Sequence, residues 1–75
     1  MTELIETIAK FLADRPDQVR VTEVSGEQSV IIQLRVAPQD MGRIIGRDGE
    51  VAKAMRELLR AVAARRGKRA TLEII

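Results

Sequence analysis

The sequence predicts an α+β fold, in which a three-stranded mixed sheet carries three helices on one face. Three observations predict it. Apolar residues recur at helical spacing in three segments, and three other segments are rich in β-branched or alternating apolar residues. These segments follow the order helix, strand, strand, helix, helix, strand. A chain of 75 residues has room for one domain, which we expect to span residues 1–75.

The first half of the chain is typical of a helix followed by a hairpin. The helix is expected to begin at Thr2 as its N-cap and to end before Pro16, because Pro disfavours helical geometry in the preceding residue. Strands over residues 19–24 and 30–36 flank a short turn at Gly26, which indicates an antiparallel hairpin. The apolar face of the helix is predicted to consist of Leu4, Ile5, Ile8, Phe11 and Leu12. The second strand is predicted to turn Val30, Ile32, Leu34 and Val36 in one direction.

The second half predicts two helices and a strand. Asp40 is expected to cap a short helix that ends near Ile45, and a long helix is expected over residues 50–64. A final strand over residues 70–75 would lie parallel to the second strand, because two connecting helices suit a crossover. The inner face of the long helix is predicted to contain Val51, Ala54, Met55, Leu58, Ala61 and Val62.

Charge is segregated along the chain, although the net charge is only +2. Residues 42–69 contain nine basic and three acidic side chains, whereas residues 1–41 contain four basic and seven acidic ones. This pattern suggests a face for a polyanion, but an ordinary solvated helix with a basic tail explains it equally well. No apolar run approaches the ~20 residues that span a bilayer, so no membrane attachment is expected. Residues 1–17 do not have the pattern of a secretory signal and the chain has no cysteine, so we expect a cytoplasmic protein.

Several function classes are excluded by composition. The chain has no Cys and no His, which removes disulfides and almost all transition-metal sites. Ser25 and Ser29 have no evident base partner, so no enzyme and no cofactor are expected. Phe11 is the only aromatic residue, which disfavours RNA modules that stack bases on aromatic platforms.

The most informative segment is Gly46-Arg47-Asp48-Gly49, between the two predicted helices. Glycine tolerates positive φ and allows another backbone to approach closely. The following helix directs free N–H groups and its positive dipole end at the gap, and an Arg at the tip can bind phosphate oxygens in a bidentate manner. When these four residues are considered without their flanks, a plain helical hairpin with Gly46 as C-cap and Asp48 as N-cap explains them. The apolar flanks and the element order favour a sugar-phosphate clamp.

The segment Ile44-Ile45-Gly46-Arg47-Asp48-Gly49, read onward to Met55, resembles the core of a KH domain. The helix and strand before this core give the α-β-β-α-α-β order of the type II, prokaryotic form. The whole chain is similar to the small stand-alone bacterial KH proteins of the KhpA family. The resemblance implies a type II KH fold that binds single-stranded RNA with little sequence preference, as an RNA chaperone or post-transcriptional regulator.

The resemblance also implies roles for particular residues. The residues that would hold the RNA backbone are Gly46, Arg47, Asp48 and Gly49. The residues that would form the helical wall of a base-binding groove are Ile44, Ile45, Val51 and Ala54, although core packing explains Ile45 and Val51 at least as well. The candidates for further phosphate contacts, or for solvated surface, are Arg43, Lys53 and Arg56. The carboxylates of Asp48 and Glu50 are expected to weaken the grip on phosphate.

Partners are implied as well. KhpA-like proteins are described as forming homodimers and as pairing with a larger KH protein of the Jag type, with links to cell elongation and division. A dimerisation or scaffold module with secondary RNA contacts is therefore the alternative function. Val24, Ile31 and Ile75, on the outward strand faces, are residues that could support such pairing.

Overall fold

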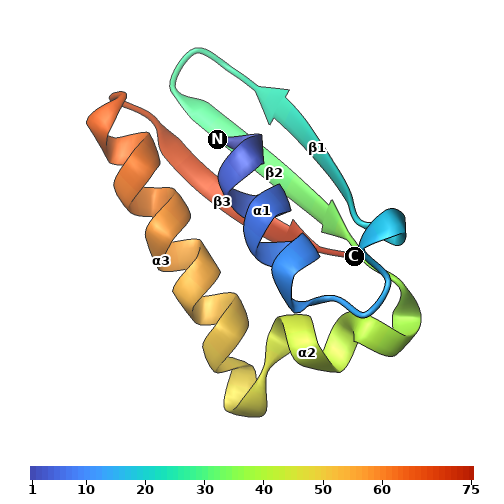
Figure 1. Cartoon of the computed structure of the whole chain (residues 1–75). Helices are drawn as coiled ribbons and strands as arrows, with labels where there is room; N and C mark the ends of the chain where they lie inside the picture. Colours follow the sequence, from blue (N-terminus) through green and yellow to red (C-terminus); the bar gives the residue numbers. More distant parts are fainter.

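Three strands form a single mixed sheet, and the helices lie on one side of it (Figure 1). The computed structural model describes residues 1–75. Its helices and strands are α1 (Thr2–Leu12), β1 (Arg20–Ser25), β2 (Ser29–Arg35), α2 (Met41–Ile45), α3 (Glu50–Arg65) and β3 (Arg69–Ile74). The strand order is β1-β2-β3, with β1 antiparallel and β3 parallel to β2. The predicted fold class and the parallel crossover are both confirmed.

The core lies between β2 and the helix layer. The predicted alternation in β2 is confirmed, because Val30, Ile32 and Leu34 are at most 1% exposed. Full burial of each such side chain stabilises the fold by about 1.5–3 kcal/mol. The complete core cluster consists of Ile5, Ala9, Val19, Val30, Ile32, Leu34, Val36, Ile44, Met55, Leu59 and Leu72. None of the helices combines the length and apolar character needed to cross a membrane.

Two large residues that were predicted to face the core lie at the surface instead. Phe11 is 88% exposed, because α1 buries Ile5 and Ala9, and a residue two positions beyond Ala9 is turned by about 200° around the helix axis. Leu58 is 49% exposed. The prediction for both side chains was therefore wrong.

The buried stripe of α3 differs from the predicted one for the same geometric reason. Its buried residues are Ala52, Met55, Leu59 and Ala63, at spacings of three and four. Of the predicted inner face, only Met55 is buried; Val51 and Val62 are half-buried, and Ala54, Leu58 and Ala61 are exposed. Ala52 and Ala63 are 2% and 0% exposed, so larger side chains at these positions would need space that a close-packed interior does not provide.

The N-terminus of α1 and the C-terminus of α3 are closed in different ways. Met1, not Thr2, occupies the N-cap position of α1, and no side chain caps that helix. At the end of α3, Lys68 N–H donates to the carbonyl of Ala63 (2.9 Å), and Gly67 N–H donates to Ala64 (3.0 Å). Gly67 has φ +69°, so this is a Schellman turn that reverses the chain into β3.

Candidate nucleic-acid interface

The loop Gly46–Gly49 joins α2 to α3 through backbone conformations that side-chain-bearing residues rarely adopt. Gly46 has φ 78° and ψ 173°, Asp48 has φ 55°, and Gly49 has φ 76°. Gly46 N–H closes α2 on the carbonyl of Gly42 (2.9 Å), and Gly49 N–H donates to the carbonyl of Gly46 (3.1 Å). The result is one tight turn, with Arg47 and Asp48 exposed at its tip.

One side of this loop is filled and the other is open. A Cβ atom on Gly46 would lie 2.4 Å from Cγ2 and 2.8 Å from Cβ of Val51, so Val51 packs directly against the loop. A Cβ atom on Gly42 or Gly49 would meet nothing within 4 Å. Space for a bound backbone is therefore open beside Gly49 and beside Gly42 in the preceding helix, whereas Val51 packs against the loop at Gly46.

Asp48 does not cap α3. The N-cap position belongs to Gly49, directly before Glu50, and no side chain caps the helix. Asp48 adopts a left-handed conformation instead, which Asp tolerates better than most residues. The plain-hairpin interpretation is therefore wrong for Asp48 as N-cap and correct for Gly46 as C-cap.

Asp40 fixes the position of α2, but by a different route from the one predicted. It occupies the N-cap position without capping its own helix. Its side chain is 0% exposed, and its two carboxylate oxygens accept hydrogen bonds from the backbone N–H groups of Asp14 and Arg15, both at 3.0 Å. This buried carboxylate ties the helix before the loop to the segment that follows α1. The loop is thereby held against the rest of the domain.

Arg43 adds to the same junction. Its Nη2 lies 2.9 Å from Oδ2 of Asp14, and both side chains are more than half exposed. Because the guanidinium already has an acidic partner, Arg43 is less available to an anionic ligand than a free arginine. Sequence reasoning had no means to pair residues that lie 29 positions apart.

The predicted groove residues fall into different environments. Ile44 is 0% exposed and belongs to the core, so its side chain is closed to any ligand. Ile45 and Val51 are half-buried, and Val51 packs against the core. Ala54 is exposed. The four therefore do not form one continuous open wall, and Ile44 and Val51 act as supports of the loop.

The outward side of α3 carries two stripes. Lys53, Arg56 and Arg60 share one stripe, because they are spaced by three and four residues. Ala54, Leu58 and Ala61 share the other by the same rule. None of the three cations is within 4.0 Å of a carboxylate, since the ion pairs of the protein involve other residues. Arg60 is not among the phosphate-contact candidates predicted from the sequence. Its spacing of four residues from Arg56 is the signal that could have identified it.

A Gly-x-x-Gly turn between two helices, packed beside a three-stranded sheet in this element order, defines a KH domain of type II. Comparison with known proteins agrees. The family model described as "KhpA/KhpB, KH domain" matches residues 2–74, and the chain belongs to this family.

Curated relatives cover the whole chain. A protein of Clostridium acetobutylicum named RNA-binding protein KhpA is 55% identical over 75 residues, which is 100% of each chain. Its namesake in Caldanaerobacter subterraneus subsp. tengcongensis is 53% identical, again over 100% of both chains. The protein of that name in Aquifex aeolicus is 45% identical over 100% of this chain and 95% of its own. No solved structure matches the chain.

Proposed function

We propose that the chain binds single-stranded RNA at the Gly46–Gly49 loop, with little preference for sequence. The observation that carries the proposal is the loop itself, because its outer side is open at Gly42 and Gly49 and its tip carries an exposed Arg47 without an ion pair. The names of the relatives, which call them RNA-binding proteins, support the same function. Nothing in this function calls for a catalytic group or a cofactor.

The proposed binding mode starts with the RNA backbone. Gly46, Arg47, Asp48 and Gly49 are the residues that would contact it. The absence of side chains at Gly42 and Gly49 leaves room for the sugar-phosphate chain, and the Arg47 guanidinium can donate two hydrogen bonds to one phosphate. Phosphate contacts fix position but carry no sequence information, which is the physical reason for low specificity.

Further contacts would follow α3 away from the loop. Lys53 and Arg56 lie in the first two turns of the helix and are candidates for the next phosphates, with Arg60 one turn further. Arg43 can contribute only donors that its pair with Asp14 leaves free. Ile45 and Ala54 are the aliphatic residues that retain exposed surface for contact with bases.

The acidic residues limit the affinity in this proposal. Asp48 is exposed within the loop, and Glu50 is exposed at the first position of α3. Both carboxylates repel phosphate, so the affinity is modest and falls with salt. Modest, non-specific binding suits an RNA chaperone or post-transcriptional regulator that works in the cytoplasm, where bacterial transcripts are made and used.

A second candidate function is dimerisation or scaffolding, and the exposed apolar residues favour it. Phe11 is 88%, Val24 55%, Leu58 49% and Ile75 49% exposed. A hollow of about 450 Å³ is lined by Leu58, Ala61, Val62, Arg65 and Arg66. A contiguous apolar hollow of this kind is typical of protein–protein contact sites, whereas apolar residues that are exposed singly are ordinary. The partner in this proposal is a second copy of the chain or a larger Jag-type KH protein, in a pathway of cell elongation and division.

Fluorescence anisotropy of a single-stranded RNA pool, at about 50 and 200 mM salt, tests the loop assignment. Arg47→Asp places two adjacent carboxylates in the loop and is expected to reduce binding strongly. Arg15→Asp is the matched control, because Arg15 is an exposed loop residue whose side chain makes no hydrogen bond or ion pair. Circular dichroism checks that both variants fold. Equal binding by both variants would contradict the assignment and favour the scaffold function.

A further inference from the structure

The open face of the sheet carries a basic hollow that lies apart from the loop. Its volume is about 300 Å³, and its lining consists of Arg20, Thr22, Gln33, Arg35 and Ile75. In the β1–β2 register Arg20 is opposite Arg35, and Thr22 is opposite Gln33. Opposite residues of an antiparallel pair point to the same face. The intervening pair, Val21 and Leu34, points toward the core, so the hollow faces away from the helices.

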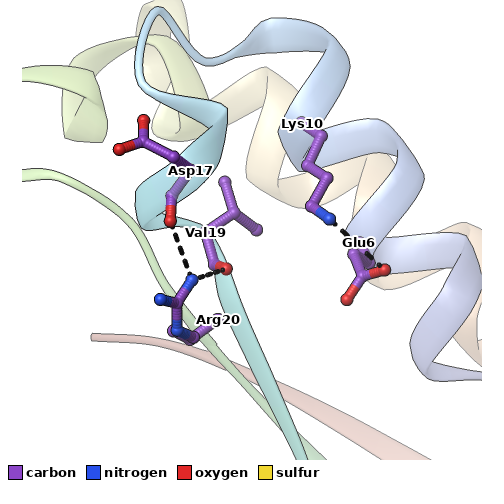
Figure 2. Close-up of polar contacts among 5 residues, drawn as sticks. All are labelled: Glu6, Lys10, Asp17, Val19 and Arg20. Atoms are coloured by element: carbon purple, nitrogen blue, oxygen red, sulfur yellow. Dashed lines mark hydrogen bonds and ion pairs between the residues drawn. The ribbon is translucent and has the colours of Figure 1, made fainter.

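The guanidinium of Arg20 is held in place before any ligand arrives. Its Nη1 donates to the carbonyl oxygens of Asp17 (2.8 Å) and Val19 (2.9 Å), as Figure 2 shows. Both hydrogens of Nη1 are occupied by these two bonds. The edge formed by Nε and Nη2 makes no other hydrogen bond in the protein, and a guanidinium edge is the group that binds phosphate oxygens in a bidentate manner.

The two arginines also lack neutralising partners. The ion pairs of the protein join Met1 to Glu3, Lys10 to Glu6 and Arg43 to Asp14. The acid on the neighbouring row of the sheet is Glu73, whose Oε1 accepts a hydrogen bond from Nε2 of Gln33 (3.0 Å). Like charges directly opposite each other destabilise a strand pair, and an anion between them removes that repulsion.

We propose that the hollow is a second phosphate-binding site, which takes a phosphate group of an RNA strand that extends beyond the loop. The inference rests on the proposed RNA-binding function. Arg20 and Arg35 supply the charge, and Thr22 supplies a hydroxyl donor at the rim. The helices α1 and α3 lie on one side of the sheet (Figure 1), and the residues of the hollow point to the other side. An RNA that fills only the loop region therefore does not reach the hollow. One chain can therefore hold two segments of RNA.

The first test uses inorganic phosphate as the probe and the side-chain Nε–Hε signals in NMR spectra as the readout. The protein is the Arg47→Asp variant, so that the loop does not compete. Saturable shifts of the Arg20 and Arg35 signals are expected, with no shift of Arg15, and Arg35→Gln is expected to abolish the shift of Arg20. Absence of these shifts would overturn the proposal. Equal shifts with acetate at the same ionic strength would also overturn it, because they would indicate a site for carboxylates of a protein partner.

The second test distinguishes RNA from free phosphate. RNA strands of about 4 and about 20 nucleotides are titrated with wild type, Arg35→Gln and the control Arg15→Gln. For the long strand, Arg35→Gln is expected to weaken binding about two- to fivefold, the range of one exposed ion pair, and to lower the salt slope by about 0.7. The short strand is expected to bind all three proteins equally. Phosphate shifts without any effect on the long strand would assign the hollow to free phosphate and refute the RNA contact.

The two proposals fail in different ways. If Arg47→Asp leaves RNA binding unchanged, the loop assignment fails, but the phosphate titration of Arg20 and Arg35 still decides whether the hollow binds phosphate. If the loop assignment holds and Arg35→Gln changes neither the NMR shifts nor the long-strand affinity, only the second site fails.

Discussion

Replacement of Gly46 by Ala tests the loop geometry at its most constrained point. Gly46 has φ 78° and ψ 173°, a region that is essentially restricted to glycine and costs other residues about 1–3 kcal/mol. The new Cβ would also lie 2.4 Å from Cγ2 of Val51, and overpacking of this kind costs about 1–3 kcal/mol. We therefore expect Gly46→Ala to lower the free energy of unfolding by about 2–6 kcal/mol, out of the ~4–11 kcal/mol typical of a domain of this length.

The neighbouring glycines provide matched controls. Gly49 also has positive φ, but a Cβ there meets no atom within 4 Å, so Gly49→Ala is expected to cost only the backbone term of about 1–2 kcal/mol. Gly42 lies within α2 with open space around it, so Gly42→Ala is expected to stabilise the protein by about 0.5–1 kcal/mol. The three substitutions add the same methyl group and differ only in backbone conformation and surroundings.

Urea unfolding followed by circular dichroism measures all three free energies. Addition of Val51→Ala to Gly46→Ala removes the nearest clashing atom, so part of the loss is expected to be recovered in a double-mutant cycle. The reasoning is refuted if Gly46→Ala costs no more than Gly49→Ala, or if the cycle shows no coupling between positions 46 and 51.

Two further predictions concern the junction and the exposed apolar surface. Asp40→Ala leaves two backbone N–H groups without their buried acceptor and is expected to cost about 2–4 kcal/mol in the same unfolding assay, whereas Asp17→Ala, at an exposed turn, is expected to change stability by less than about 0.5 kcal/mol. Equal effects would show that Asp40 does not hold α2. Leu58→Glu is expected to shift any concentration-dependent dimer toward monomer in sedimentation velocity while the protein stays folded, because Leu58 is 49% exposed. An unchanged dimer would exclude this face from the interface.

The strands could be predicted from sequence because their signal is local. Alternation in residues 30–36 specifies both the strand and the side that is buried, and Val30, Ile32 and Leu34 lie in the core as expected. The crossover that makes β3 parallel to β2 follows from the two helices between them. The tight turn at Gly46 could be predicted for the same reason, because the glycine that ends α2 is itself the local signal.

The helix faces could not be predicted as well, because two neighbouring stripes of α3 are both apolar. The apolar residue Leu58 suggested one face, but the face that is buried holds Ala52, Met55, Leu59 and Ala63. Which of the two stripes is buried depends on how α3 packs against the sheet. The spacing of apolar residues along the sequence carries no information about that packing. Phe11 was misplaced in the same way.

Polar residues that act at long range were equally beyond sequence reasoning. Asp40 stands where an N-cap belongs, and only the folded chain shows that its carboxylate binds the backbone of Asp14 and Arg15 instead. The pairing of Arg43 with Asp14 has the same origin. These contacts decide how firmly the loop is held, although the loop motif itself is visible in the sequence.

Backbone amide NMR of the wild-type protein, titrated with a short single-stranded RNA, tests the central proposal most directly. We expect the largest shift changes at residues 46–49 and in the first turn of α3, with smaller changes at Arg56 and Arg60 along the helix. Changes confined to the surroundings of Leu58 or of Phe11, or no changes at all, would contradict RNA binding at the Gly46–Gly49 loop.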